Sequence, residues 1–342
     1  MSFRGAPQNR AQKCFSKRVN AFPPEVHPNA KILSARPIKL TTRTGIEVQR
    51  LFPQAGFRKI GAWCFLDHFG PTPQEDAMVV AAHPHTGLQT ATWLIDGAVE
   101  HRDSIGSVQA LLPGEVNLMT AGRGIAHSEL GLVEQDFAHP NQQQLHAVQL
   151  WIALPDSARH MAPTFEHHGN LPKVAGRGFS AKVFIGEFHG AVSPAQTYTP
   201  LVGAQLSIDG TEPVIIPLHT EFEHGILLLT GGLFVDGKHV EAGQLIYLPP
   251  GDGGVTVHAT RTGTQALLLG GEPFDEHLVM WWNFIGRTHA EIAEMRTLWN
   301  QRGAESAPEI EASHERFGAV FTDRVGGWIP APELPNVELR SR

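Results

Sequence analysis

The sequence predicts an all-β protein made of two similar lobes, and three observations support this. Short apolar runs such as MVVAAH, LQTATWLI and LHAVQLWIAL are separated by Gly, Pro or Asp at the close spacing of a β-sandwich or barrel. The 35 Gly and 25 Pro are spread along the chain, which is typical of many strands joined by tight turns. At 342 residues the chain is longer than one sandwich needs, so we expect two domains.

An internal repeat supports the two lobes. LIDGAVEHRDSIG runs on to LLPGEVNLMTAG in the first half, and LLTGGLFVDGKHVEAGQLIYLPPG repeats the same order of strands and Gly turns in the second. When Gly231 is aligned with Gly97, His219 falls opposite His85 and Pro217 falls opposite His83. We therefore expect a duplicated chain whose second lobe holds no metal.

Two local elements can be predicted outside the repeat. Residues 31–53 resemble a hairpin, because alternating runs flank the turn-compatible pair Thr44-Gly45. The stretch GRTHAEIAEMRTLWNQRG predicts a helix that ends before Gly303 and begins with a capping box formed by Thr288 and Glu291. The apolar stripe of this helix is Ile292, Met295 and Leu298.

Two short motifs, HPHTGLQTATWLIDG and TAGRGIAHSE, carry the main functional signal. They place His83 and His85, and then His127 and Glu129, two residues apart, so that each pair points to one face of a strand. A single H-x-H is more often a surface pair or a half-buried histidine than a metal site. Four unpartnered polar groups on an apolar inner face would be costly, so two such pairs favour a shared metal ion. Three imidazoles and a carboxylate suit Fe, Ni, Co, Cu, Mn or Zn better than Mg or Ca.

Charge and cysteine content limit the cellular role. Residues 1–60 hold twelve Lys or Arg against two acids, Glu25 and Glu47, although the whole chain has a net charge of -7. Such an arm can bind nucleic acid, but it lacks a base-reading motif, so we expect it to lie across the acidic remainder of the molecule or of a dimer partner. Cys14 and Cys64 form no regular framework, and no signal peptide or membrane span is visible. We expect a cytoplasmic protein that contacts neither membrane nor nucleic acid directly.

The motifs HPHTGLQT, GAVEHRDSIG, PGEVNLMTAGRGIAHSE and HAVQLWIALP, with FLDHFGP and GGEP, resemble the pirin family of the cupin superfamily from about residue 35 to 285. The resemblance implies a bicupin, in which two antiparallel β-barrels of the double-stranded β-helix or jelly-roll type are stacked and a short C-terminal helix follows. It implies four parts: a basic arm (1–34), a metal-binding barrel (35–160), a barrel without metal ligands (161–285), and a helix with a tail (286–342).

The resemblance also implies the metal ligands. These are His83, His85, His127 and Glu129, and the expected ion is one Fe(II), with Zn, Ni, Mn, Co or Cu as alternatives. Two positions depart from the usual pirin motif, since Thr86 stands where many members have a basic residue and Gln89 where they often have Glu. Neither residue is an expected ligand, so these departures concern the surroundings of the metal.

The activity associated with pirin-like proteins is quercetin 2,3-dioxygenase, which opens a flavonol with O₂. In this interpretation Glu129 is both a ligand and the base that accepts a proton from a substrate hydroxyl. The alternative is a non-enzymatic, iron-dependent redox sensor that binds a transcription factor or a metabolic enzyme as its protein partner. An isomerase or hydrolase of another cupin kind would need further acid or base residues. The substrate, the metal in the cell, the oligomeric state and the roles of the arm and of residues 304–342 stay open.

Other polar and aromatic residues near the motifs allow two interpretations. His146 can face the cavity or serve as a core or rim histidine, and His68 and His101 are expected in turns or on strand surfaces. Trp93 and Phe69 can line a pocket for a flat ligand, although buried aromatic side chains belong more often to the core.

Overall fold

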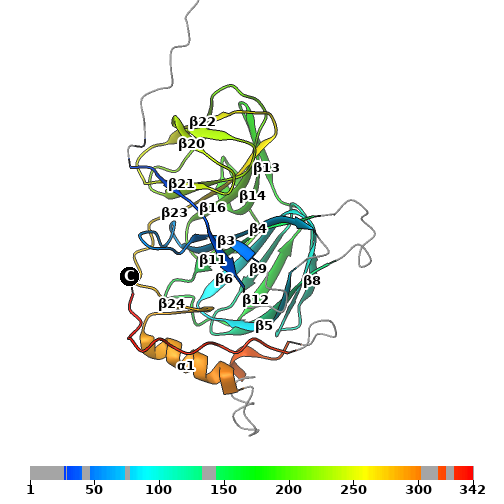
Figure 1. Ribbon diagram of the computed structural model, residues 1–342, viewed down its shortest axis with the longest axis vertical. Helices are drawn as coiled ribbons and strands as arrows, with labels where there is room; N and C mark the ends of the chain where they lie inside the picture. Colours follow the sequence, from blue (N-terminus) through cyan, green and yellow to red (C-terminus); the bar gives the residue numbers. More distant parts are fainter. Residues whose placement is uncertain are drawn as a thin grey trace, which may run out of the picture.

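Antiparallel strands make up most of the computed structural model, which describes residues 27, 29–40, 47–73, 78–132, 144–301, 315–320 and 327–341. The fold is the predicted all-β one, with two barrels one above the other and a helix beneath the lower barrel (Figure 1). In each barrel a large sheet faces a four-stranded sheet. Within the described residues, no helix is long and apolar enough to cross a membrane.

The first barrel has a seven-stranded sheet in the order β12-β9-β6-β11-β4-β3-β2 and a four-stranded sheet in the order β5-β10-β7-β8. The strands of the larger sheet are β2 (Arg36–Lys39), β3 (Glu47–Phe52), β4 (Trp63–Pro73), β6 (Leu88–Asp96), β9 (Val116–Thr120), β11 (Gln144–Ala153) and β12 (Thr164–His168). Those of the smaller sheet are β5 (Val79–His85), β7 (Val99–Asp103), β8 (Val108–Leu111) and β10 (Ile125–Gly131).

The second barrel repeats this order. Its larger sheet runs β1-β21-β18-β23-β16-β14-β13, with β15 beside β14, and its smaller sheet runs β17-β22-β19-β20. The larger sheet contains β1 (Lys31–Leu33), β13 (Lys173–Gly176), β14 (Phe179–Phe188), β15 (Ala191–Val192), β16 (Leu201–Ile208), β18 (Glu223–Thr230), β21 (Leu245–Leu248) and β23 (Thr264–Gly271). The smaller one contains β17 (Val214–Pro217), β19 (Leu233–Val235), β20 (Lys238–Val240) and β22 (Gly254–Ala259).

The matching strand orders confirm the duplication predicted from the repeat. Strand β6 ends just before Gly97 and β18 ends just before Gly231, and both glycines have positive φ angles, 89° and 103°. The interiors of the two barrels nevertheless differ. Apolar side chains such as Phe188, Ile226 and Val257 fill the second barrel, whereas the first contains the histidine motifs.

Each barrel takes an edge strand from the chain segment next to the other barrel. Strand β12 follows the other strands of the first barrel in the sequence and pairs with β9 of that barrel. Strand β1 precedes the first barrel in the sequence but pairs with β21 of the second barrel. His27 anchors the entry to β1, since its Nδ1 lies 2.5 Å from Oδ2 of the buried Asp236. The predicted hairpin is confirmed for β2 and β3, while its turn at Thr44-Gly45 and most of the basic arm lie outside the described residues.

The two barrels share one apolar core. Trp63, Trp93 and Val148 of the first barrel belong to the same buried cluster as Phe184 and Leu267 of the second. The Trp93 ring stacks on Phe184 with centroids 4.7 Å apart, and its Nε1 donates to Oε1 of Gln205 at 2.7 Å. Because the large sheets bury apolar side chains against each other, the barrels are fixed in orientation.

The C-terminal part of the chain returns to the first barrel. A short hairpin of β24 (Val279–Trp281) and β25 (Phe284–Gly286) leads into α1 (His289–Asn300), beneath the barrel in Figure 1. The Thr288 half of the predicted capping box is confirmed, because Thr288 Oγ1 accepts a hydrogen bond from the Glu291 backbone N–H. The Glu291 carboxylate accepts the backbone N–H of Arg287 at 2.9 Å, where a capping box would have that of Thr288. The buried face of α1 is Ile292, Met295 and Trp299, with Leu298 partly buried.

Candidate functional site

Three neighbouring strands carry the polar residues of the first barrel. Strand β10 lies between β5 and β7, and His127 on β10 lies opposite His83 on β5. A register shift follows, so that Glu129 pairs with Val80. Such a bulge re-aims side chains locally, and Glu129 lines the same cavity as the histidines. The structure therefore brings the three predicted histidines together, while Glu129 lines the same cavity outside the group that they form.

The three histidines converge on one point. One ligand atom from each of His83, His85 and His127 lies within 4.8 Å of the others, and Nε2 of His85 is 3.1 Å from Nε2 of His127. His83 Nδ1 lies 2.9 Å from the Ala81 carbonyl oxygen, which can only accept a hydrogen bond. His83 Nδ1 therefore carries the proton, and its Nε2 keeps a free lone pair.

Burial keeps these imidazoles neutral. It lowers the pKa of His83 to about 4 and holds the pKa values of His85 and His127 well below their usual range. Neighbouring imidazoles lower the pKa values of all three further. A neutral imidazole is the form that binds a metal, so the site is ready for a cation without first losing protons from these rings.

Glu129 is buried beside the histidines with few polar partners. Its Oε1 accepts a long hydrogen bond of 3.5 Å from Thr92 Oγ1, and that hydroxyl also lies 3.0 Å from Oε1 of Gln149. Burial raises the pKa of Glu129 to about 7, although the contact with Thr92 lowers it in part. This carboxyl group can therefore hold or release a proton near neutral pH.

A third pair, His101 and Asp103 on β7, adjoins the predicted ligands. His101 lies opposite Glu129, and its Nδ1 is 3.3 Å from Nδ1 of His127. Its Nε2 is 3.0 Å from Oδ2 of Asp103. The expectation that His101 serves a turn or a strand surface was wrong, because only 4% of it is exposed. His101 and Asp103 are two residues apart, as His127 and Glu129 are, and this shared spacing was the signal that could have revealed the third pair.

The histidines and Glu129 line a cavity of about 240 Å³. Its other walls are mostly apolar, with Ile38, Leu40, Phe65, Phe69, Met78, Val80, Trp151, Trp282 and Ile329. Phe69 thus lines the pocket, as one interpretation of the sequence suggested. Trp93 does not, because its ring lies in the core between the barrels.

An aromatic stack leads from the cavity wall to His85. The guanidinium of Arg50 lies 4.4 Å above the Phe65 ring, which stacks on Trp151 at 3.9 Å. Trp151 in turn contacts His85 edge-on, with centroids 5.2 Å apart. Arg50 also donates two hydrogen bonds of 2.7 Å to Asp67, which fix the guanidinium plane. This end of the cavity is therefore held rigidly.

Two cavity walls come from the C-terminal part of the chain. Trp282, in the turn between β24 and β25, has a φ of 52°, which is a strained conformation for a non-glycine residue. Ile329 donates its backbone N–H to the Ala82 carbonyl at 2.8 Å, which places this segment beside β5. The candidate site thus depends on segments about 200 positions after its histidines.

The turn that follows His85 is pressed against β25 and α1. The Thr86 hydroxyl donates to Met295 Sδ at 2.8 Å, and its carbonyl accepts the Ile285 N–H at 3.1 Å. Gly87 has a φ of 69°, and a Cβ atom there would lie 2.3 Å from the Ile285 carbonyl oxygen. Only glycine fits this contact.

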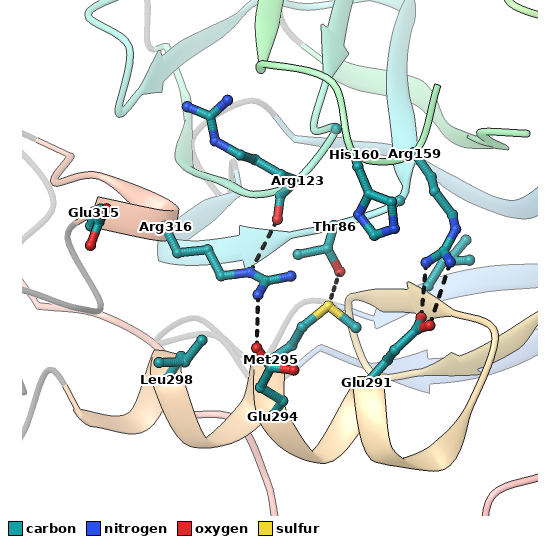
Figure 2. A pocket seen from close by; sticks show the side chains of 13 residues that line it. Thr86, Arg123, Arg159, His160, Glu291, Glu294, Met295, Leu298, Glu315 and Arg316 are labelled. Carbon is teal, nitrogen blue, oxygen red and sulfur yellow. Dashed lines mark hydrogen bonds and ion pairs between the residues drawn. The ribbon is translucent and has the colours of Figure 1, made fainter. Parts of the chain in front are cut away.

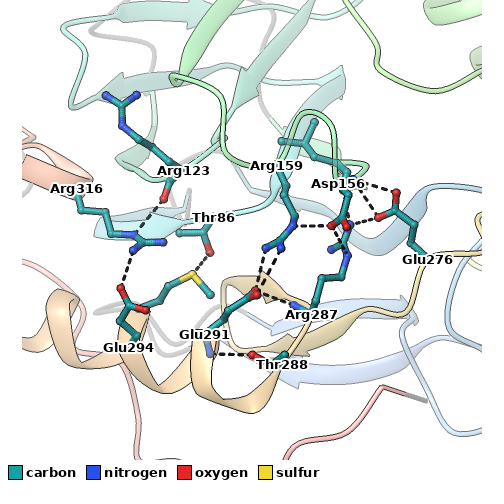
Figure 3. Close-up of polar contacts among 12 residues, drawn as sticks. Thr86, Arg123, Asp156, Arg159, Glu276, Arg287, Thr288, Glu291, Glu294 and Arg316 are labelled. Carbon is teal, nitrogen blue, oxygen red and sulfur yellow. Dashed lines mark hydrogen bonds and ion pairs between the residues drawn. The ribbon is translucent and has the colours of Figure 1, made fainter.

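Ion pairs hold α1 in this position (Figure 3). Arg159 bonds to Glu291 at 2.9 Å and to Asp156 at 2.7 Å. Arg287 pairs with Asp156 at 3.2 Å and with Glu276. The network ties the helix start to the loop after β11, so the support beneath His85 is fixed at several points.

A second cavity, of about 500 Å³, lies between this turn and α1 (Figure 2). Its lining contains the arginines Arg123, Arg159 and Arg316 and the glutamates Glu291, Glu294 and Glu315. In Figure 2, Arg159 points to Glu291 and Arg316 points to Glu294. Since these charges balance, the lining favours neither anions nor cations, and the candidate site is the smaller cavity with the histidines.

His68 and His146 do not line this cavity, and both are buried, so the expectation that His68 serves a turn or a strand surface was wrong as well. His146 Nε2 lies 2.7 Å from His68 Nε2, and burial lowers the pKa of both rings, that of His68 to about 4. Gln89 donates from Nε2 to Thr120 and to the Gln196 backbone carbonyl, at the junction of the barrels. Like Thr86, Gln89 therefore differs from the usual motif at a position outside the cavity.

Two protein-family models match the sequence. Residues 45–152 match the Pirin family model, and residues 204–305 match the model of the pirin C-terminal cupin domain. The chain is 45% identical, over 85% of its length and 87% of the relative's, to a Pseudomonas aeruginosa protein named as a candidate quercetin 2,3-dioxygenase. It is 31% identical to a pirin-like protein of Caulobacter vibrioides, over 84% of this chain and 94% of that one.

Solved structures agree with these matches. The crystal structure of a quercetin 2,3-dioxygenase from Acinetobacter baumannii superposes with a TM-score of 0.80 at 39% identity, covering 92% of this chain and 98% of that one. The Escherichia coli pirin YhhW, solved in complex with nickel(II), shares the fold at 18% identity, with a TM-score of 0.53 over 71% of this chain and 99% of that one.

Two stacked cupin-type barrels, with a cluster of three histidines in the first, define the protein class as a bicupin. The chain belongs to the pirin family.

Proposed function

We propose that this pirin is an iron-dependent dioxygenase that opens flavonols of the quercetin type. The observation that carries the proposal is the convergence of three neutral histidines and Glu129 on one cavity with aromatic walls. The names of the relatives in Pseudomonas aeruginosa and Acinetobacter baumannii support the same substrate class.

The donor set suits the proposed metal. His83, His85 and His127 would hold the ion through Nε2, and Glu129 would add a carboxylate oxygen. Three imidazoles and one carboxylate fit a divalent transition metal, and Fe(II) is the ion that we assign. Four protein ligands leave coordination positions for a substrate and O₂. Zn, Ni, Mn, Co and Cu are the alternatives for the loading experiment.

The residues of the cavity account for the rest of the proposed chemistry. The metal, when bound, would supply Lewis acidity toward a substrate hydroxyl. Glu129 would accept the hydroxyl proton on a carboxylate oxygen, since its pKa of about 7 matches the working pH. Phe65, Phe69 and Trp282 would hold a flat ring and exclude water. The overall reaction consumes O₂ and releases carbon monoxide from the opened ring.

One observation favours a second function, an iron-dependent redox sensor that binds a transcription factor or a metabolic enzyme. The cavity of about 240 Å³ is smaller than most small-molecule sites, which span about 300–1,000 Å³. A flavonol would therefore require a wall of the cavity to move. A sensor would need no such movement.

The proposal also includes the division of the chain. Residues 35–160 would hold the metal and 161–285 would hold none, between a basic arm at 1–34 and a C-terminal helix and tail at 286–342. We place the protein in the cytoplasm, with a flavonol-like substrate and O₂ as its small-molecule partners.

The deciding experiment is anaerobic loading with Fe(II), metal quantification per chain, and measurement of O₂ uptake and flavonol absorbance after quercetin is added. We expect iron-dependent turnover in the wild type, none in Glu129→Gln despite retained iron, and no bound metal in His127→Ala. Glu100→Gln is the matched control, because Glu100 pairs with Arg102 and does not line the cavity. Stoichiometric iron without turnover would favour the sensor, and full metal occupancy in His127→Ala would refute the ligand set.

A further inference from the structure

A row of hydrogen-bonding contacts on β7 and β10 links Asp103, His101 and His127. Asp103 Oδ2 can only accept when ionised, so His101 donates from Nε2 across the 3.0 Å contact. With its one ring proton on Nε2, His101 presents a bare Nδ1, which can accept at 3.3 Å from Nδ1–H of His127. His127 is left with a bare Nε2, the atom that lies among the other histidines.

The carboxylate that begins this row is itself held in place. Asp103 Oδ1 accepts backbone N–H groups of Ile105 at 3.0 Å and Ser107 at 2.9 Å, while Oδ2 faces His101. The His101 ring stacks on Phe165 of β12, with centroids 4.4 Å apart and planes 16° apart. Both His101 and Asp103 are buried, so water does not compete for these bonds.

We propose that Asp103 and His101 form a positioning relay that holds His127 in the tautomer and orientation that present Nε2 to the metal. The relay rests on the metal site of the proposed function but not on the reaction catalysed there. Hydrogen-bonded partners behind a histidine ligand orient the ring and make its donor nitrogen more basic. His83 is held in a comparable way by the Ala81 carbonyl, so two of the three ligands have preset tautomers.

The first test is metal affinity, measured with Zn²⁺ against a competing chelator. In His101→Phe the ring still stacks on Phe165, but His127 Nδ1–H loses its acceptor, so we expect the Kd to rise about 10- to 100-fold. His101→Gln retains an acceptor oxygen and should recover most of the affinity. His146→Phe is the matched control, because it replaces a buried histidine of the same barrel that lies outside the relay.

The second test reads the relay directly in the wild-type protein. In the Zn²⁺-loaded, histidine-labelled chain we expect a ¹⁵N–¹⁵N coupling through the hydrogen bond from His127 Nδ1 to His101 Nδ1. Asp103→Asn can turn its amide N–H₂ toward His101, force the other tautomer and abolish this coupling. The same affinity in His101→Phe as in the wild type, or a His127 that carries its proton on Nε2, would overturn the relay. A wild type that binds no metal would overturn the metal site as well, whereas missing quercetin turnover would affect only the proposed reaction.

Discussion

Burial raises the pKa of Glu129 and lowers the pKa values of the three histidines, because burial disfavours the charged form of each group. The pKa of Glu129 rises to about 7, whereas that of His83 falls to about 4. Between pH 5 and 7 the metal-free site therefore contains a protonated carboxyl group and neutral imidazoles. In the proposed site, a cation that binds the Glu129 carboxylate must displace its proton.

This difference predicts how metal affinity depends on pH. Below pH 7, binding of Zn²⁺ should release about one proton, and the apparent affinity should fall about tenfold per pH unit. Above pH 7 Glu129 is already ionised, so its contribution should level off. Calorimetry in buffers of different ionisation enthalpy measures the released proton. Glu129→Gln should abolish the effect between pH 5 and 7, and an unchanged pH dependence in this variant would assign the proton to another group.

The turn between β5 and β6 connects the histidine pair of β5 to the C-terminal elements. Replacing Gly87 with Ala puts a side chain at a φ of 69° and a Cβ atom 2.3 Å from the Ile285 carbonyl. We expect a loss of more than about 2 kcal/mol of unfolding free energy, since the left-handed backbone alone costs about 1–2 kcal/mol. Weaker Zn²⁺ binding should accompany it, because the turn directly follows His85.

Gly243 provides the matched control for this element. Its φ is 81°, and no heavy atom of the described residues lies within 4 Å of the position its Cβ atom would take. Gly243→Ala should therefore incur only the backbone cost of about 1–2 kcal/mol and leave metal affinity unchanged. Urea unfolding and chelator competition measure both quantities. If Gly87→Ala and Gly243→Ala lost the same unfolding free energy and the same Zn²⁺ affinity, the contact between Gly87 and β25 would not support the site.

The shared core predicts that the whole molecule unfolds as one unit. Trp93 is fully buried between the barrels, where it stacks on Phe184 and bonds to Gln205. Trp93→Ala should lower the unfolding free energy by about 3–5 kcal/mol while keeping a single calorimetric transition. Val192→Ala, at a side chain 64% exposed, should change little. Two separate transitions in the wild type would mean that the barrels are independently stable.

The sequence by itself determined the strand class, the duplication, the helix with its Thr288 cap, and the histidine pairs. These follow from local rules, because a period of two sets the face of a strand residue and a cap needs only its own first turn. Tertiary structure alone decided that β7 lies beside β10, which turns His101 and Asp103 into neighbours of His127. It also brought Trp282 and Ile329 to the cavity. The physical reason is that contacts between distant segments depend on strand order and on the packing of whole sheets, which no local pattern in the chain encodes.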